Sequence, residues 1–112
     1  MKIIDLDSDR FCDFYSMQDL VSSMLKNMIV WSWGAHEFTR QNERFLSFKV
    51  MGRTFNGTVY LAVNGADLFE IYFCNSDKMI IDERLNIYID DLISVIDSRV
   101  ETIQKATNST EL

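Results

Sequence analysis

Residues 45–74, FLSFKVMGRTFNGTVYLAVNGADLFEIYFC, carry the predicted sheet and are called the deciding stretch below. Within it, large apolar residues alternate with small or polar ones in three runs, about 44–51, 55–63 and 67–74. Alternation of this kind indicates strands that bury one face. Asn64-Gly65 lies between the last two runs and is typical of a hairpin turn. The stretch therefore predicts an antiparallel three-stranded meander.

An amphipathic helix is expected on each side of this meander. Residues 16–33 begin with Ser16, a good N-cap, and carry one apolar stripe at spacings of three and four. Residues 84–104 carry a second stripe, formed by Leu85, Ile89, Leu92, Ile96, Val100 and Ile103. Residues 35–40 are consistent with an additional edge strand. The predicted fold class is α+β, a small antiparallel three- or four-stranded β-meander packed against two helices in the order α-β-β-β-α.

The whole chain, residues 1–112, is expected to form a single α+β domain, because its length suits one hydrophobic core. Residues 1–15 are interpreted as an N-terminal arm laid on the domain, where aromatic side chains such as Phe11 find apolar surface. The polar residues 106–112 are expected to form a frayed tail.

Charge and cysteine content restrict the class of partner. The chain has a net charge of −6, which repels phosphate backbones and anionic lipid surfaces, so neither direct nucleic-acid binding nor membrane binding is expected. No apolar run approaches the ~18 residues of a membrane span. Two cysteines are too few for a disulfide framework, which favours a reducing, cytoplasmic location with free thiols.

The most unusual local feature is the run Trp31-Ser32-Trp33-Gly34-Ala35-His36. Two tryptophans, a glycine and the only histidine could form a recognition surface or hold a ligand by stacking. The alternative is a buried helix end, capped by Gly34 in a left-handed conformation. Phe38 follows closely and adds to an excess of large apolar residues for a core of this size.

Acidic residues form a second candidate surface. Glu83, Asp90, Asp97 and Glu101 are spaced so that a helix over 84–104 aligns them beside its apolar face. A stripe of this kind is either a solvated surface or an electrostatic handle for a basic partner, including mimicry of DNA phosphates.

The sequence contains no complete metal or catalytic motif. Asp5, Asp7 and Asp9 match the start of a calcium loop, but Arg10 and Ser16 stand where that loop needs glycine and glutamate. The two cysteines and the histidine form neither a Cys-x-x-Cys motif nor a histidine pair. We therefore expect no metal, no cofactor and no catalytic residue.

The predicted element order resembles that of double-stranded-RNA-binding domains. Those domains grip phosphates with a basic cluster at the start of their second helix. Asp82 and Glu83 occupy that position here, so RNA binding is not expected.

The stretch from Trp31 through Val95 resembles small uncharacterised proteins of gut Bacteroidetes and their mobile elements. The motifs that carry the resemblance are the run from Trp31 to His36, Phe48-Lys49-Val50, Gly57-Thr58-Val59-Tyr60, Asn64-Gly65-Ala66-Asp67-Leu68 and Tyr88-Ile89-Asp90-Asp91-Leu92. The resemblance implies a cellular setting and a fold, and it implies no chemistry.

Three functional hypotheses follow from these features. The first is a non-enzymatic protein-interaction module that pairs with a second copy of itself or with another protein, through Trp31, Trp33, His36 and Phe38. The second is an acidic inhibitor of a nucleic-acid enzyme, of phage or mobile-element origin, that binds through Asp90, Asp97 and Glu101. The third is a small enzyme that uses His36 or a cysteine, which requires a concave pocket containing His36 beside a carboxylate or thiol.

Overall fold

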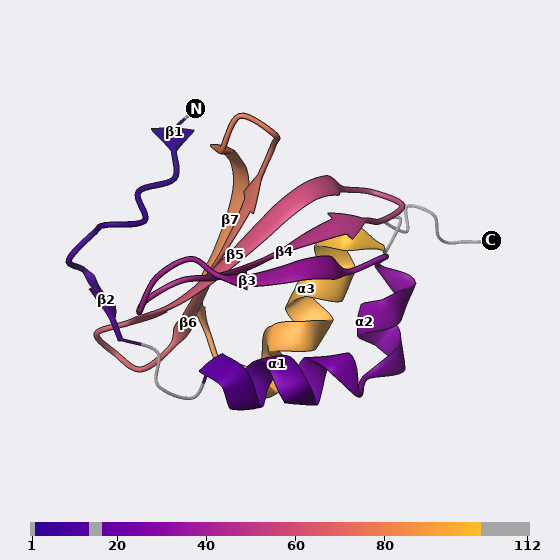
Figure 1. Cartoon of the computed structure of the whole chain (residues 1–112), viewed down its shortest axis with the longest axis horizontal. Coiled ribbons are helices and arrows are strands. Elements are labelled where there is room, and N and C mark those ends of the chain that lie inside the picture. The colour runs from indigo at the N-terminus through magenta and orange to yellow at the C-terminus, as the bar shows by residue number, and fades with distance from the viewer. Residues whose placement is uncertain (1, 14–16, 102–112) are drawn as a thin grey trace.

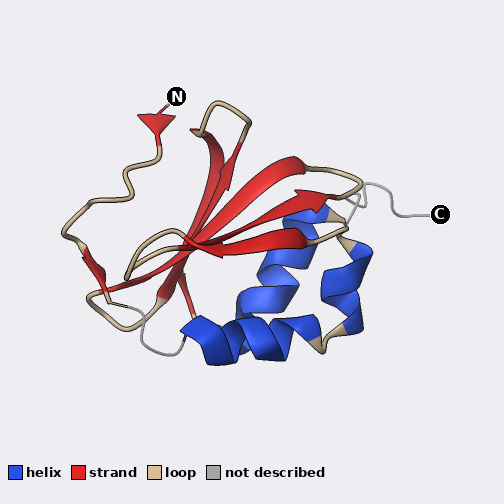
Figure 2. Cartoon of the chain, viewed as in Figure 1, coloured by secondary structure: helices blue, strands red, loops and turns tan. Residues whose placement is uncertain are grey.

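The computed structural model describes residues 2–13 and 17–101. These residues form a seven-stranded antiparallel sheet with three short α-helices against one of its faces (Figures 1 and 2). The strand order is β1-β7-β6-β5-β4-β3, and β2 pairs with β5 outside this path. The elements are β1 Lys2–Ile3, β2 Phe11–Cys12, α1 Met17–Leu25, α2 Met28–Ser32, β3 His36–Arg40, β4 Leu46–Met51, β5 Asn56–Asn64, β6 Phe69–Cys74, β7 Met79–Ile87, the 3₁₀ turn η1 Ile89–Asp91, and α3 Leu92–Val100.

The predicted three- or four-stranded α-β-β-β-α fold is wrong. The three runs of the deciding stretch form β4, β5 and β6, and residues 36–40 form the edge strand β3. The sheet is larger because residues 79–87 form β7, and because the arm contributes β1 and β2. The element order therefore differs from that of double-stranded-RNA-binding domains, and the predicted frayed tail lies outside the described residues.

The turn after β6 explains why the chain returns as a strand. It repeats the turn before β6: in each, the Oδ1 atom of an asparagine, Asn64 or Asn75, accepts backbone N–H groups two and four residues further on. The residue three positions after each asparagine, Asp67 or Lys78, has a positive φ angle. Such a turn reverses the chain into an antiparallel neighbour. Residues 79–87 consequently pair with β6 along its length.

The helix predicted over 84–104 is shorter than expected. Leu85 lies in β7 and Ile89 in η1, and both are exposed, whereas Leu92, Ile96 and Val100 of α3 are buried against the sheet. Only this second half of the predicted stripe packs as a helix face. It joins the core on the helical side of the sheet, whose largest fully buried members include Trp33, Phe48 and Phe73.

The helix predicted over 16–33 is broken in the middle. Lys26 and Asn27 separate α1 from α2, and the Asn27 side chain caps α2 by accepting a hydrogen bond from the N–H of Ile29 at 2.8 Å. An asparagine with extended backbone angles favours the start of a helix over its interior, so the chain changes direction there. The predicted N-cap, Ser16, lies outside the described residues.

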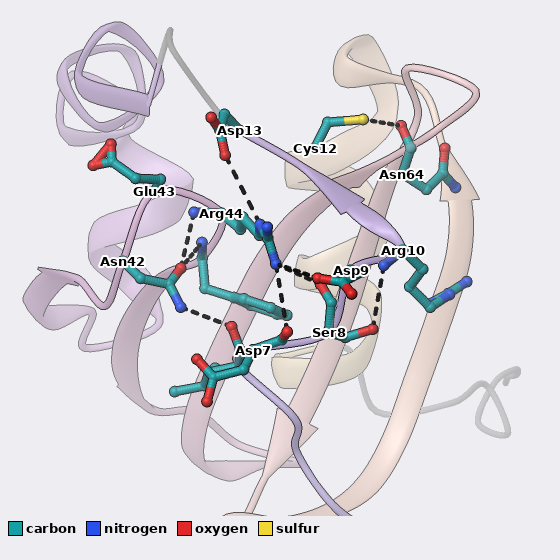
Figure 3. A network of polar contacts seen from close by, with 12 residues as sticks. Asp7, Ser8, Asp9, Arg10, Cys12, Asp13, Asn42, Glu43, Arg44 and Asn64 are labelled. Carbon is teal, nitrogen blue, oxygen red and sulfur yellow. Dashed lines mark hydrogen bonds and ion pairs between the residues drawn. The ribbon is translucent and has the colours of Figure 1, made fainter.

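The N-terminal arm covers part of the opposite sheet face and creates a second core. Ile4 and Phe11 of the arm pack with Phe45, Tyr60 and Tyr72, which the strand alternation places on the face away from the helices. Arg44 lies at the centre of the polar network that holds the arm (Figure 3). Its guanidinium donates to the Ser8 carbonyl at 2.9 Å and pairs with carboxylates of the arm, those of Asp9 and Asp13.

Candidate functional site

An exposed apolar surface lies where α1 meets α2. Leu25, Met28, Ile29 and Trp31 are all exposed there, Met28 at 85% and Trp31 at 57%. The indole Nε1 of Trp31 donates to the Leu25 carbonyl at 2.8 Å, which lays the ring across the junction of the two helices. We call these four residues the corner surface.

The corner surface exists because of the break at Asn27. A single helix over 16–33 predicts a fully buried apolar end, but the capped restart rotates α2 so that only Val30 and the following Trp33 face the core. Met28, Ile29 and Trp31 then face outward. The polar pair Lys26-Asn27 within an apolar run was the sequence signal for the break between α1 and α2.

The two tryptophans therefore have different environments. Trp33 is fully buried, its indole Nε1 donates to Oδ1 of Asp97 at 2.9 Å, and its ring stacks on Phe48 with centroids 6.2 Å apart. Gly34 follows with a φ of +64°, the left-handed conformation predicted for it. Trp33 thus ties the end of α2 to α3 and to the sheet, and Trp31 alone is presented at the surface.

His36 and Phe38 lie on opposite faces of β3. Phe38 stacks on Phe48 at 4.9 Å between centroids, on the helical side. His36 pairs in register with Lys49, on the face away from the helices. The structure therefore does not bring His36 and Phe38 into one site with Trp31.

The predicted acidic stripe is not formed. Glu83 lies in β7 and Asp90 in η1, so neither is on the helix that carries Asp97. Asp97 accepts the hydrogen bond from Trp33, and the Glu101 carboxylate accepts the backbone N–H of Arg53 at 3.1 Å. The four carboxylates do not share one helix face.

A polar groove of about 840 Å³ lies on the sheet face away from the helices. It contains His36 beside the carboxylate of Glu37, with 3.7 Å between Nε2 and Oε2, and the histidine Nδ1 lies 2.7 Å from the Gly34 carbonyl oxygen. A histidine beside a carboxylate in a concave site is what the enzyme hypothesis required. Neither cysteine lines this groove.

The thiols have separate surroundings. Cys12 is exposed on β2, and its Sγ lies 3.6 Å from the Asn64 carbonyl oxygen. Cys74 is fully buried, and burial raises the pKa of its thiol to about 11. A thiol with such a pKa stays protonated at neutral pH, which suits a core residue and not a nucleophile.

Within residues 2–13 and 17–101, no three His, Cys, Asp or Glu side chains are grouped so that they could hold a metal ion. In the same residues, no helix has the length and apolarity needed to cross a membrane.

No family model matches the chain, and no curated protein or solved structure is significantly similar to it. The resemblance to proteins of gut Bacteroidetes stays a prediction. The corner surface and the polar groove are therefore the features on which a functional proposal depends.

Proposed function

We propose that this protein is a non-enzymatic interaction module that associates with a second copy of itself through the corner surface. The observation that carries the proposal is the exposure of four large apolar side chains within seven residues, Leu25 to Trp31. Aromatic residues and methionine are enriched at protein interfaces, and a tryptophan is a frequent centre of binding energy.

The composition of the corner surface favours a second copy over an unrelated partner. Homodimer interfaces are more apolar than transient ones, and the four side chains carry no charge. A two-fold contact needs only one surface that meets its own copy, and we assign this role to the exposed side of α2. The helix α2 lies at the outer end of the helical layer, where a second molecule can approach it (Figure 1).

The two other hypotheses receive less support. The acidic-inhibitor hypothesis was motivated by a stripe of carboxylates that is not formed. The enzyme hypothesis gains a histidine beside a carboxylate, but the Nδ1 atom of His36 already faces the Gly34 carbonyl oxygen. No nucleophilic thiol lines the groove that contains His36.

Size-exclusion chromatography with light scattering tests the proposal. The wild type is expected to elute with the mass of a dimer, and Met28→Lys with the mass of one chain, because a charge at the centre of an apolar contact is costly to bury. Ile3→Lys is the matched control: Ile3 is 65% exposed on β1, away from α2, and its replacement should leave the dimer intact. A monomeric wild type at high concentration, or equal behaviour of the two variants, contradicts the proposal.

A further inference from the structure

The polar groove occupies the part of the far sheet face that the arm leaves open. Its walls come from β3, β4 and β5 and from the turn between β6 and β7. Side chains with amide or hydroxyl groups are frequent in the lining, which includes Gln41, Ser47, Asn56, Thr58, Tyr60 and Asn75. The volume of about 840 Å³ falls within the range of about 300–1,000 Å³ typical of small-molecule sites.

A β-bulge in the edge strand shapes one wall. His36 pairs with Lys49 and Thr39 with Ser47, so three steps along β3 match two steps along β4. The extra residue places both His36 and Thr39 on the groove side, and Glu37 adopts a φ of +53° within the bulge. Bulges of this type redirect side chains and are common beside functional sites.

Two buried residues that carry hydroxyl groups, Tyr60 and Ser47, line the groove. Tyr60 is only 4% exposed, and its hydroxyl makes no hydrogen bond to the part of the chain that the structure describes. Ser47 is 3% exposed and accepts a hydrogen bond from Gln41 Nε2 at 2.7 Å, and its hydroxyl donates none to the described residues. Buried donors are normally paired, so these two hydroxyl groups are available to an acceptor that binds in the groove.

The charge of the groove is opposite to that of the molecule. Lys49 and Lys78 line it against a single carboxylate, Glu37, in a chain whose net charge is −6. Glu37 lies 3.2 Å from the Lys49 ammonium, whereas Lys78 makes no ion pair within residues 2–13 and 17–101. Local positive charge beside hydroxyl donors is the combination that binds oxyanions.

We propose that this groove binds a small polar ligand bearing a carboxylate or phosphate group, with Lys49 and Lys78 supplying charge and Tyr60 a hydrogen bond to the oxyanion. The amide side chains of Gln41, Asn56 and Asn75 can both donate and accept, which suits hydroxyl groups on the rest of the ligand. Burial raises the pKa of Tyr60, so its hydroxyl remains a donor at neutral pH.

The proposal is tested by adding small-molecule probes to the isotope-labelled protein and recording the shifts of its backbone amide resonances by NMR. Three probes separate the chemistry: glucose 6-phosphate carries a phosphate, glucuronate a carboxylate, and glucose neither. The proposal expects saturable shifts at Lys49, Thr58, Tyr60 and Lys78 with at least one anionic probe and none with glucose; the probe that binds identifies the anion. Shifts that are absent with both anions, or equal with glucose, overturn it.

Variants connect the binding to the named side chains. Tyr60→Phe and Lys78→Ala should each raise the dissociation constant about tenfold. A hydrogen bond to a charged group contributes at least the free energy that corresponds to a tenfold change in affinity. Tyr60→Phe should fold normally, because the hydroxyl has no partner to lose within the described chain. Lys26→Ala is the matched control, an exposed lysine outside the groove. Wild-type affinity in both groove variants overturns the proposal.

The corner variant separates this inference from the proposed function. Met28→Lys should bind the anionic probe with the affinity of the wild type, because residue 28 does not line the groove. A loss of binding in Met28→Lys overturns the assignment of the ligand to the groove of a single chain.

Discussion

The guanidinium of Arg10 lies side by side with the carboxylate of Glu70, with 2.6 Å between Nη1 and Oε1 and 2.8 Å between Nη2 and Oε2. Glu70 is 1% exposed in β6, inside the sheet, and Arg10 belongs to the arm. The Tyr72 hydroxyl donates to Oε1, and Asn64 Nδ2 donates to Oε2 at 3.0 Å. The arm therefore neutralises a buried charge as well as covering apolar surface.

Replacing Arg10 should destabilise the protein strongly. Arg10→Met leaves the Glu70 carboxylate buried without a countercharge, and removing one partner of a buried pair costs roughly 3–5 kcal/mol. The Arg10 side chain is 54% exposed, so solvent screening should reduce the loss to about 2–3 kcal/mol of unfolding free energy. Urea denaturation measures it. Arg53→Met, at an exposed arginine, should change little, and an equally small effect of Arg10→Met would contradict this role of the arm.

The same pair should make stability depend on pH in the acid range. Burial alone would raise the pKa of Glu70, but hydrogen bonds from Arg10, Tyr72 and Asn64 outweigh it and hold the pKa below its ordinary value. A pKa lower in the folded than in the unfolded state stabilises the protein above the unfolded value of about 4.3. That contribution is lost as the pH falls through the folded-state pKa.

Denaturation midpoints of the wild type and Glu70→Gln, compared between about pH 7 and about pH 2, measure this linkage. The wild type should lose more stability on acidification than the variant. A variant that loses as much as the wild type would show that Glu70 does not titrate as described.

The turn between β4 and β5 should not tolerate a side chain at Gly52. A Cβ atom there would lie 2.2 Å from Cγ1 and 2.4 Å from the carbonyl oxygen of Val100, at the end of α3. The backbone cannot retreat easily, because Thr54 N–H donates to that same oxygen at 2.8 Å. Gly52→Ala should cost about 1–3 kcal/mol, the usual range for overpacking.

Gly65→Ala is the matched control for this substitution, since a Cβ at Gly65 meets nothing within 4 Å. Its effect on thermal unfolding should be within about 0.5 kcal/mol. Equal melting temperatures for the two alanine variants would contradict the close contact between the turn and α3.

Two tyrosines on one sheet face should respond oppositely to loss of the hydroxyl group. Tyr60→Phe removes a buried hydroxyl with no partner in the described chain, and should stabilise the fold by about 1 kcal/mol while weakening oxyanion binding. Tyr72→Phe removes a donor to buried Glu70 and should destabilise by about 1–3 kcal/mol. Chemical denaturation of both variants distinguishes these signs, and a destabilised Tyr60→Phe would indicate that its hydroxyl already has a partner.

The strands of the deciding stretch were predictable because their alternation is local. The error over β7 arose because Leu85 and Ile89 are four residues apart, a spacing that fits a helix face and also a strand face. The sequence of β6 carried a signal for the larger sheet: Phe73 packs on one face of the strand and Tyr72 packs on the other. A strand apolar on both faces belongs to a sheet that is covered on both sides, as central strands are.

The surfaces were harder to predict than the strands. Trp31 and Trp33 look alike in sequence, and only the cap at Asn27 decides which of them faces the core. The groove has no sequence motif at all: Lys49, Tyr60 and Lys78 come together because three chain segments meet on one sheet face. Long-range pairing of this kind cannot be read from local patterns.

Sedimentation equilibrium of the wild type and Trp31→Ala, over protein concentrations up to about 1 mM, tests the proposed self-association most directly. We predict that the apparent mass of the wild type rises with concentration to twice that of one chain, and that Trp31→Ala stays at the mass of one chain. A wild type that remains a single chain throughout, or a Trp31→Ala variant that dimerises equally well, would contradict it.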